Sequence, residues 1–281
     1  MMRIKANKII DSIKIEVKAK VDAYKIKGIK PTIQTIIASD NAAIKPYILS
    51  KIKQAANLGI AMKVIELGSN KKHEAFEALI RVSNNDKSIH GIIIDLPIRN
   101  DLDQNQVLTI IDQKKDIDGL NPLNQALIQQ GQENKTICPA APQACIKLAE
   151  TIDLLSGKQV VVIGRGPTVG KPLATMLINR NATVTIVHSR SKNLAHTLRP
   201  AKFIFTATGQ PGLLNANNVT ARHVIIDAGI AYKNDKLVGD FDVEAANKVM
   251  AYSSVPGGVG SLTSVIIFSN LLKCMNMQGY F

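Results

Sequence analysis

The sequence predicts an α/β fold in which two successive βα series each form a parallel sheet. Apolar runs of strand length alternate with amphipathic helical patterns in both halves of the chain, and parallel strands need helical crossovers of this kind. A stretch over 119–142, rich in Gly, Asn, Gln and Pro, separates the two series and indicates a connection. The 281 residues suffice for one large domain or two modest ones.

The first series opens with an amphipathic helix over 3–25, because isoleucines and valines recur there at helical spacing among lysines. The elements that follow are predicted as strand 31–39, helix 43–57, strand 61–67, helix 73–83 and strand 91–97. Open parallel sheets bind ligands at the carboxyl ends of their strands, so residues 39–41 and 95–97 are expected to line a crevice.

The second series follows the connection. Its strands are predicted at 159–164, 183–189, 202–209 and 223–229, with a helix over 169–180 after the first of them. The chain then closes with a glycine-rich segment, 255–260, and a helix over about 262–275.

The charge balance is strongly basic, with 35 Lys and Arg against 22 Asp and Glu and a net charge of +13. Of the cations 27 are lysines, and aromatic residues make up 4% with no Trp, so few side chains are present that stack on bases. We therefore expect no nucleic-acid partner and attribute the charge to a lysine-rich composition. A basic nucleic-acid binder stays open as an alternative.

Neither a membrane segment nor a metal site is expected. No apolar run reaches the ~18 residues of a membrane span, and lysines interrupt the N-terminal apolar residues, so a cytoplasmic protein is predicted. Three cysteines, Cys138, Cys145 and Cys274, are an odd number without the spacing of metal ligands.

A glycine-rich turn follows the strand at 159–164. Gly164, Gly166 and Gly170 lie between an apolar strand and a helix, as in sites that hold the phosphates of a dinucleotide. The spacing, G-x-G-x-x-x-G, departs from the usual fingerprint, so an ordinary glycine-rich strand–helix turn is the alternative reading.

The end of the next strand favours NADP over NAD. NAD sites place an acidic residue about 20 positions after the turn, whereas this strand ends in His188, Ser189, Arg190 and Ser191. Hydroxyls and a guanidinium suit a 2′-phosphate that a carboxylate would repel, and Arg165 adds a second cation. His188 is equally consistent with packing at the strand end.

Several segments together resemble the bifunctional methylenetetrahydrofolate dehydrogenase/methenyltetrahydrofolate cyclohydrolase family, in the correct order and over nearly the whole chain. They are SDNAAIKPYILSKIKQAANLGI, GIIIDLP, KKDIDGLNPLN, PAAPQA, VVVIGRGPTVGKPLATMLINRNATVTIVHS, TATGQP, VIIDAGI, LVGDFD and SVPGGVGSLT.

The resemblance implies two α/β domains with a cleft between them. An N-terminal folate-binding catalytic domain would span 1–142 and be completed by the C-terminal helix 262–281, and a Rossmann-like NADP-binding domain would span 143–261. The family oxidises methylenetetrahydrofolate with NADP and hydrolyses the methenyl product to formyltetrahydrofolate without a metal. The resemblance also implies a homodimer and a place in tetrahydrofolate interconversion for purine biosynthesis.

The resemblance carries site residues onto this chain by position. Those expected to bind or act on the folate are Tyr47, Lys51, Asp95, Leu96, Pro97, Asp118, Pro256, Gly257, Gly258, Val259 and Gly260. Those expected to contact NADP are Gly164, Arg165, Gly166, Ser189, Arg190, Ile230 and Thr263. Among the first group, Tyr47, Lys51 and Asp95 are the expected catalytic residues.

The chemistry of Tyr47 and Lys51 fits this role. The two residues stand four positions apart and share a helix face, and a lysine in a partly dehydrated cleft is able to move protons near neutral pH. Cyclohydrolysis needs such proton movement, whereas hydride transfer mainly needs positioning. A surface helix with a solvated lysine is the alternative reading of this pair.

The sequence departs from the family pattern chiefly at Asp95, where the family has a glutamine. A carboxylate beside Lys51 would hold the lysine as an ammonium ion and oppose its use as a base. This predicts, as an alternative function, a dehydrogenase with weak or absent cyclohydrolase activity. Further departures are Ala42, Ile44, Ala140, Ala141, Ala144, Ser261 and Leu262, and a non-catalytic paralogue that only binds ligand is a further alternative.

Overall fold

The computed structural model describes residues 2–39, 45–68, 72–233 and 236–281, with only the backbone described at 45–47. Contacts divide the chain into two compact units. The six-stranded unit comprises Met1–Asp11, Ile128–Gly131 and Pro139–Ile266, and the three-stranded unit comprises Ser12–Leu127, Gln132–Cys138 and Ile267–Phe281.

The predicted α/β fold with parallel sheets is confirmed, although these units differ from the predicted domain ranges. Residues 1–11 belong to the six-stranded unit because β1 (Met2–Ile4) pairs in parallel with β11 (Ala251–Ser253). A three-residue strand has no periodicity of its own, so the sequence predicted only a helix there.

In the three-stranded unit, β2 (Thr32–Ile37) lies between β3 (Ala61–Glu66) and β4 (Gly91–Asp95), and both pairings are parallel. All six residues of β2 are buried, as expected for the central strand of a covered parallel sheet. The crossovers are α2 (Lys45–Leu58) and α3 (His73–Asn85). Ile37 pairs with Glu66 on one side and Asp95 on the other, so the three carboxyl ends are level.

The C-terminal residues Ile267–Phe281 belong to the three-stranded unit. Asn270, on α9 (Val259–Met277), donates from Nδ2 to the carbonyls of Ile117 (2.8 Å) and Cys138 (3.0 Å). The hydroxyl of Tyr24, on α1 (Asn7–Ile26), donates to Asn276 Oδ1 at 2.9 Å. By length and composition α9 would suffice to cross a membrane, but 67% of its apolar window is buried inside the fold, as in a core helix.

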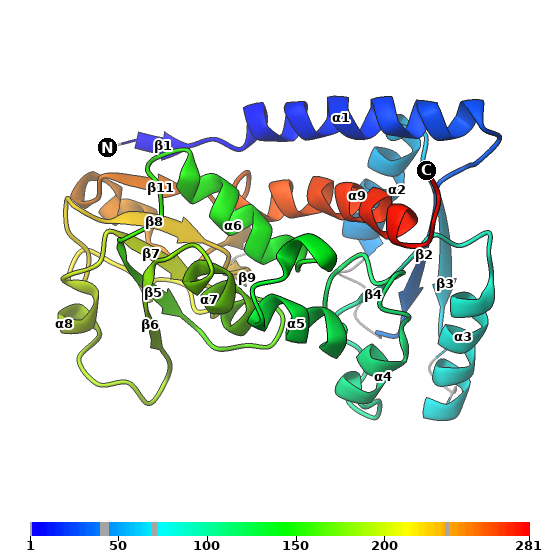
Figure 1. Cartoon of the computed structure of the whole chain (residues 1–281). Coiled ribbons are helices and arrows are strands. Elements are labelled where there is room, and N and C mark those ends of the chain that lie inside the picture. The colour runs from blue at the N-terminus through cyan, green and yellow to red at the C-terminus, as the bar shows by residue number, and fades with distance from the viewer. Residues whose placement is uncertain (1, 40–44, 69–71, 234–235) are drawn as a thin grey trace. The chain divides into compact units, whose positions relative to one another are not determined.

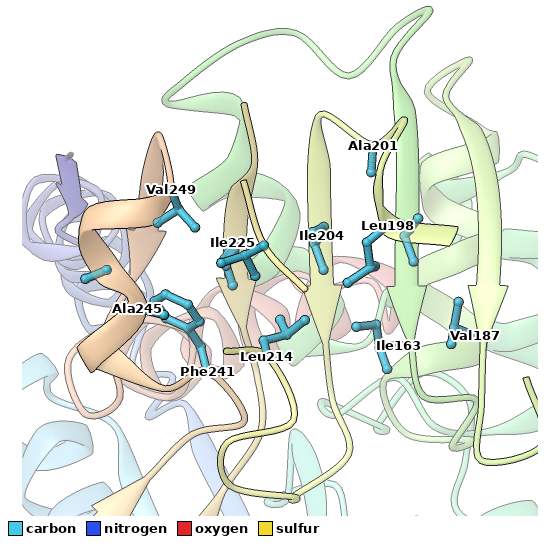
Figure 2. Packing of buried hydrophobic residues seen from close by; sticks show 13 residues of the cluster. Ile163, Val187, Leu198, Ala201, Ile204, Leu214, Ile225, Phe241, Ala245 and Val249 are labelled. Carbon is cyan, nitrogen blue, oxygen red and sulfur yellow. The ribbon is translucent and has the colours of Figure 1, made fainter. Parts of the chain in front are cut away.

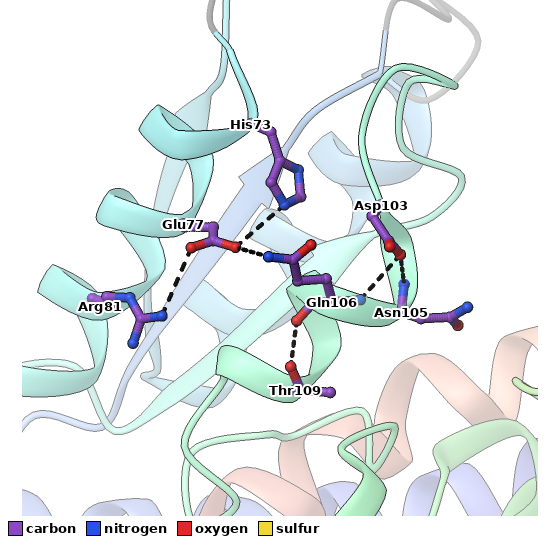
Figure 3. Close-up of polar contacts among 7 residues, drawn as sticks. All are labelled: His73, Glu77, Arg81, Asp103, Asn105, Gln106 and Thr109. Atoms are coloured by element: carbon purple, nitrogen blue, oxygen red, sulfur yellow. Dashed lines mark hydrogen bonds and ion pairs between the residues drawn. The ribbon is translucent and has the colours of Figure 1, made fainter.

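Polar contacts join α3 to α4 (Gln104–Ile110) on the surface of this unit (Figure 3). The Glu77 carboxylate accepts from Gln106 Nε2 at 2.5 Å and lies 3.3 Å from His73 Nε2. Asp103 caps α4 by accepting the backbone N–H groups of residues 105 and 106.

The six-stranded sheet has the order β1-β11-β8-β7-β5-β6, and its neighbouring strands pair in parallel (Figure 1). Four strands agree with the predicted second series: β5 (Gln159–Ile163), β7 (Phe203–Thr206) and β8 (Val224–Asp227) inside the sheet, and β6 (Thr183–Val187) at its edge. The predicted helix after the first strand is α7 (Gly170–Ile178).

In β5, β7 and β8, alternate residues are buried on opposite faces of the sheet. Val161, Ile204 and Ile225 join one apolar cluster, while their neighbours along each strand are buried too. Figure 2 shows this cluster, which includes Phe241 and extends to the short η3 segment (Val243–Lys248). Apolar side chains on both faces explain why the strands read as continuous apolar runs.

The stretch 119–142, predicted as the connection between the two series, contains helices that the sequence analysis did not assign. They are α5 (Pro122–Gln129), η2 (Glu133–Lys135) and the start of α6 (Ala140–Glu150). Pro122 does not interrupt α5, because it occupies the first position of the helix, where the missing N–H costs nothing. The sequence also left unassigned α4, α8 (Leu194–Leu198), and the antiparallel pair β9 (Ala231–Lys233) and β10 (Lys236–Val238).

Candidate functional site

A buried ion pair lies where α2 meets the carboxyl end of β4. Lys51 Nζ donates to Asp95 Oδ1, and the two residues are only 4% and 6% exposed. Among the residues that the structure describes, none donates to the second carboxylate oxygen, Asp95 Oδ2, although this atom is buried. A buried acceptor without a donor is costly, so this oxygen is suited to receive a hydrogen bond from a ligand.

Asp118 belongs to the same electrostatic environment. The pKa of Asp118 is raised to about 7, chiefly by burial and next by the charge of Asp116, while Lys51 opposes the shift more than Asp95 adds to it. Near neutral pH this carboxyl therefore changes between a neutral donor and an ionised acceptor. The sequence-predicted residues Lys51, Asp95 and Asp118 are thus brought together in the three-stranded unit.

The turn that presents Asp118 is held by residues that the sequence analysis did not single out. The buried carboxylate of Asp116 accepts from the backbone N–H of Gly119 (3.0 Å) and Asn121 (2.7 Å), and from Asn124 Nδ2 at 3.0 Å. Loss of hydration at Asp116 raises its pKa. The segment DIDGLNPLN contains these residues, but only the fold shows which of its two aspartates is structural.

The remaining predicted folate residues of this unit lie nearby in sequence. Tyr47 is on α2, one turn before Lys51, and its side chain lies outside the described residues, as do Ala42 and Ile44. Leu96 is half-buried and Pro97 is exposed directly after β4.

The glycine turn is built as a close approach between backbones. Gly164 follows β5 with φ of +109°, and a Cβ there would lie 2.7 Å from the carbonyl oxygen of Ala207. A Cβ on Gly170 would lie 2.3 Å from the carbonyl oxygen of Gly164. Both positions therefore exclude residues larger than glycine, so these two glycines of the motif are required by the backbone geometry.

Gly166 differs, because a Cβ there would meet no atom within 4 Å. Space is thus open at the point where the chain enters α7, whose first residue is Gly170 and whose N-cap, Val169, makes no side-chain hydrogen bond. The exposed Arg165 guanidinium and the positive end of the α7 helix dipole suit a pyrophosphate. These residues fit the phosphates of a dinucleotide.

The end of β6 provides cations and hydroxyls on the surface. The Ser191 hydroxyl accepts from the N–H of His188 (3.1 Å), whose Nδ1 accepts from the N–H of Arg190 (3.2 Å). Ser189 and Arg190 are both exposed at the tip of this turn. The local role of His188 is therefore to shape the turn, in line with its structural reading.

The predicted contacts from the end of the chain lie in the six-stranded unit. Ile230 is exposed between β8 and β9, and Pro256 and Gly257 are exposed in a turn after β11. Gly258 is buried there, where a Cβ would lie 2.5 Å from the Ser254 carbonyl oxygen.

The last helix begins at residue 259, earlier than the predicted start at about 262, so the glycine-rich segment before it is shorter than expected. Val259 and Gly260 form the first turn of α9, and Thr263 lies on the same helix with its hydroxyl donating to the Val259 carbonyl at 2.9 Å. A Cβ on Gly260 would meet no atom within 4 Å, so the space around this residue does not require a glycine.

Two further carboxylates of the six-stranded unit escaped the sequence analysis. Asp227 and Asp240 are buried, and each accepts hydrogen bonds from loop backbone. They occur in the segments VIIDAGI and LVGDFD, but nothing local marks them as buried. In the described part of the chain, no group of three or more His, Cys, Asp or Glu residues is arranged to hold a metal.

Comparison with known proteins agrees with both halves of the site. Residues 4–118 match the tetrahydrofolate dehydrogenase/cyclohydrolase catalytic domain, and residues 139–279 match the NAD(P)-binding domain of the same family. The bifunctional protein FolD of Heliobacterium modesticaldum is 40% identical over 270 residues, which cover 95% of this chain and 93% of that protein.

Solved structures agree with the fold. The bifunctional FolD enzyme of Campylobacter jejuni has a TM-score of 0.93 at 34% identity, covering 98% of this chain and 99% of that one. The Trypanosoma brucei methylenetetrahydrofolate dehydrogenase-cyclohydrolase, solved with NADP and an inhibitor, has a TM-score of 0.92 at 30% identity, covering 100% and 99%. The chain belongs to the tetrahydrofolate dehydrogenase/cyclohydrolase family.

Proposed function

We propose that this chain oxidises 5,10-methylenetetrahydrofolate to 5,10-methenyltetrahydrofolate with NADP, and hydrolyses the product to 10-formyltetrahydrofolate. The observation that carries the proposal is the buried Lys51–Asp95 pair, with the half-buried Asp118 in its electrostatic environment, in a unit that matches the family's catalytic domain. The glycine turn at Gly164–Gly170, in the NAD(P)-binding half, supports the choice of a dinucleotide.

The oxidation requires little proton chemistry from the protein. NADP, when bound, supplies the hydride acceptor. Gly166, Arg165 and the start of α7 would hold its phosphates, and Ser189 and Arg190 would hold the 2′-phosphate. Asp118 would orient the pterin by hydrogen bonds to its N–H groups, since an ionised carboxylate accepts such bonds. The rate advantage comes from holding the bridging carbon in place.

The hydrolysis requires proton transfer. Water adds to the bridging carbon and loses one proton, which leaves a hydroxyl group on that carbon. As the hydroxyl loses its own proton and becomes the formyl carbonyl, one carbon–nitrogen bond breaks and the departing nitrogen takes up a proton. Lys51, whose ammonium group is oriented by Asp95, is a described side chain of this unit suited to take part in these proton transfers.

Two assays with purified protein test the proposal. NADPH formation from 5,10-methylenetetrahydrofolate, followed by absorbance, reports oxidation, and the decay of 5,10-methenyltetrahydrofolate reports hydrolysis. We expect both, with NADP strongly preferred to NAD. Binding of folate and NADP without turnover of either substrate would contradict the proposal and indicate a non-catalytic paralogue.

The Lys51–Asp95 pair favours a second candidate, a dehydrogenase with weak cyclohydrolase activity. A carboxylate in direct contact with the ammonium group attracts its positive charge, and an ammonium ion has no lone pair with which to accept a proton from water. The two candidates differ only in the second assay, where robust decay of the methenyl compound supports the bifunctional enzyme and decay at the uncatalysed rate supports the second candidate.

The proposed setting is that of a cytoplasmic homodimer in tetrahydrofolate interconversion, supplying one-carbon units for purine biosynthesis, without a nucleic-acid or membrane partner. The family resemblance supports this setting. Light scattering of the purified chain tests the dimer, and salt-dependent retention on duplex DNA tests the expected lack of nucleic-acid binding.

A further inference from the structure

The buried carboxylate of Asp240 gathers donors from a single loop of the six-stranded unit. Its Oδ2 accepts from the Thr206 hydroxyl, from the Thr208 N–H (2.8 Å) and from the Thr208 hydroxyl (2.8 Å). Its Oδ1 accepts from the Gln210 N–H at 2.7 Å. Both oxygens are satisfied by residues 206–210, the segment in which β7 ends and turns.

This segment lies between two parts of the predicted NADP site. On one side, a Cβ on Gly164 of the glycine turn would lie 2.7 Å from the Ala207 carbonyl oxygen. On the other side, a Cβ on Gly209 would lie 3.3 Å from the Ile230 carbonyl oxygen. Segment 206–210 is therefore in close backbone contact with both the phosphate turn and the residue expected beside the nicotinamide.

A second contact joins Asp240 directly to the segment that carries Ile230. A Cβ on Gly229 would lie 2.2 Å from Asp240 Oδ1, so the backbone at Gly229 passes directly over the carboxylate. The N–H of Gly229 donates to Asp227 Oδ1 at 2.8 Å, and Asp227 Oδ2 accepts from the N–H of Phe241 at 2.9 Å.

The arrangement is reciprocal, since a Cβ on Gly239 would lie 2.1 Å from Asp227 Oδ2. Each carboxylate thus lies against a glycine of the segment that carries the other. The loops after β7, β8 and β10 (Lys236–Val238) are joined in this way through two buried side chains rather than through strand pairing.

We propose that Asp240 is a positioning residue for the nicotinamide half of NADP, because it fixes segment 206–210 and thereby the Ile230 backbone relative to the glycine turn. The inference rests on the proposed function. Asp240 is fully buried and its oxygens bind the protein's own loop, so its effect passes through the loop that it holds. The adenosine half, expected at Ser189 and Arg190 after β6, does not depend on this loop.

Asp240→Asn tests the proposal, because an amide supplies one acceptor oxygen where the loop presents four donor groups. We expect the single-turnover rate of hydride transfer to fall by about tenfold or more, while the Kd for 2′,5′-ADP, which lacks the nicotinamide half, stays within about twofold. Asp242→Asn is the matched control, since Asp242 lies two residues away and caps the η3 segment.

A milder pair of variants covers the case in which Asp240→Asn fails to fold. Thr208→Val removes the hydroxyl that donates to Asp240, and Thr208→Ser retains it. Thr208→Val should slow hydride transfer by about threefold or more, and Thr208→Ser should behave as the native enzyme. Equal rates in these two variants, or parallel losses of hydride transfer and of 2′,5′-ADP affinity in Asp240→Asn, would overturn the proposal.

Amide hydrogen exchange in the free protein separates this inference from the proposed function. We expect Asp240→Asn to speed exchange at Thr208 and Gln210 whether or not the chain turns over folate. A native chain without oxidation activity would refute the proposed function, whereas unchanged exchange at these amides would refute the role of Asp240 in holding the loop.

Discussion

Lys51 Nζ, on α2, donates to Asp95 Oδ1 at the carboxyl end of β4. The two side chains carry opposite charges, and each residue is more than nine-tenths buried. The pair joins a helix to a strand end, and none of the described residues donates to its second carboxylate oxygen, which is buried. Whether this contact withholds Lys51 from proton transfer distinguishes the two proposed activities.

Asp95→Gln should raise the rate of methenyltetrahydrofolate hydrolysis by about tenfold, because a neutral amide orients Lys51 without stabilising its ammonium form. Oxidation, which depends on positioning, should change by no more than about threefold. Asp103→Asn, on the surface cap of α4, is the control. A native enzyme that already hydrolyses rapidly and loses this activity in Asp95→Gln would refute the charge argument.

Lys51→Met should lower the free energy of unfolding by about 3–5 kcal/mol, because it leaves the Asp95 carboxylate buried without a counter-charge. Urea denaturation at pH 7 measures this loss. In the double variant Lys51→Met/Asp95→Leu, most of the stability should return, since no buried charge remains. Additive losses in the double variant would show that the two side chains act independently.

Gly166→Ala should separate folding from ligand binding. A Cβ at this position meets no atom within 4 Å, so the thermal midpoint should not change, while NADP binding should weaken by about tenfold because the methyl group enters the space expected to hold phosphate. Gly164→Ala is the contrasting variant and should cost about 1–3 kcal/mol of stability, given its positive φ and the nearby Ala207 carbonyl. Unchanged NADP affinity in Gly166→Ala would place the phosphates elsewhere.

Arg190→Gln should reduce the preference for NADP over NAD by roughly tenfold to a hundredfold, the range expected for a charge-assisted hydrogen bond to phosphate. The measurement is the ratio of kcat/KM values for the two cofactors. Arg222→Gln, another arginine of the six-stranded unit, should leave that ratio unchanged. Equal ratios in native and Arg190→Gln protein would exclude Arg190 as the 2′-phosphate contact.

The free energy of unfolding should decline as pH rises from about 4 to 7, because Asp118 loses its proton at a higher pH in the folded state than in the unfolded state. Its pKa is about 7 in the folded protein against an ordinary value of 3.8, so the folded state binds more protons than the unfolded state in this window. The stabilisation is complete below about pH 4 and is lost as pH passes through about 7. Asp118→Asn should flatten this part of the curve of unfolding free energy against pH.

The same titration should affect folate binding in the opposite sense. An ionised Asp118 accepts hydrogen bonds from the pterin, so the KM for 5,10-methylenetetrahydrofolate should fall as pH rises from about 6 to 8. A KM that is independent of pH in the native enzyme would contradict this role of Asp118.

Sequence alone was sufficient for the features that local pattern encodes. Strands β2, β4, β5, β7 and β8 are buried on both faces and read as apolar runs, and the glycine turn is marked by residues that its backbone requires. The two βα series, and the family, followed from these patterns and their order.

Helices in polar sequence were harder to predict. In α5 the asparagines, glutamines and a proline concealed the helical period, although Pro122 stands where a helix tolerates it. The edge strand β1 has three residues, and only its pairing with β11, far along the chain, makes it a strand.

Only the tertiary structure decided which charged residues are buried and what they bind. Lys51, Asp95 and Asp118 were identifiable from motifs, but the unpartnered oxygen of Asp95 and the raised pKa of Asp118 depend on the loss of water around them. Asp227 and Asp240 were missed for the same reason. The sequence around an aspartate near a strand end does not show whether the side chain is exposed to solvent or buried and bonded to neighbouring loops. Burial and hydrogen bonding are determined by segments distant in sequence, and a linear pattern does not contain them.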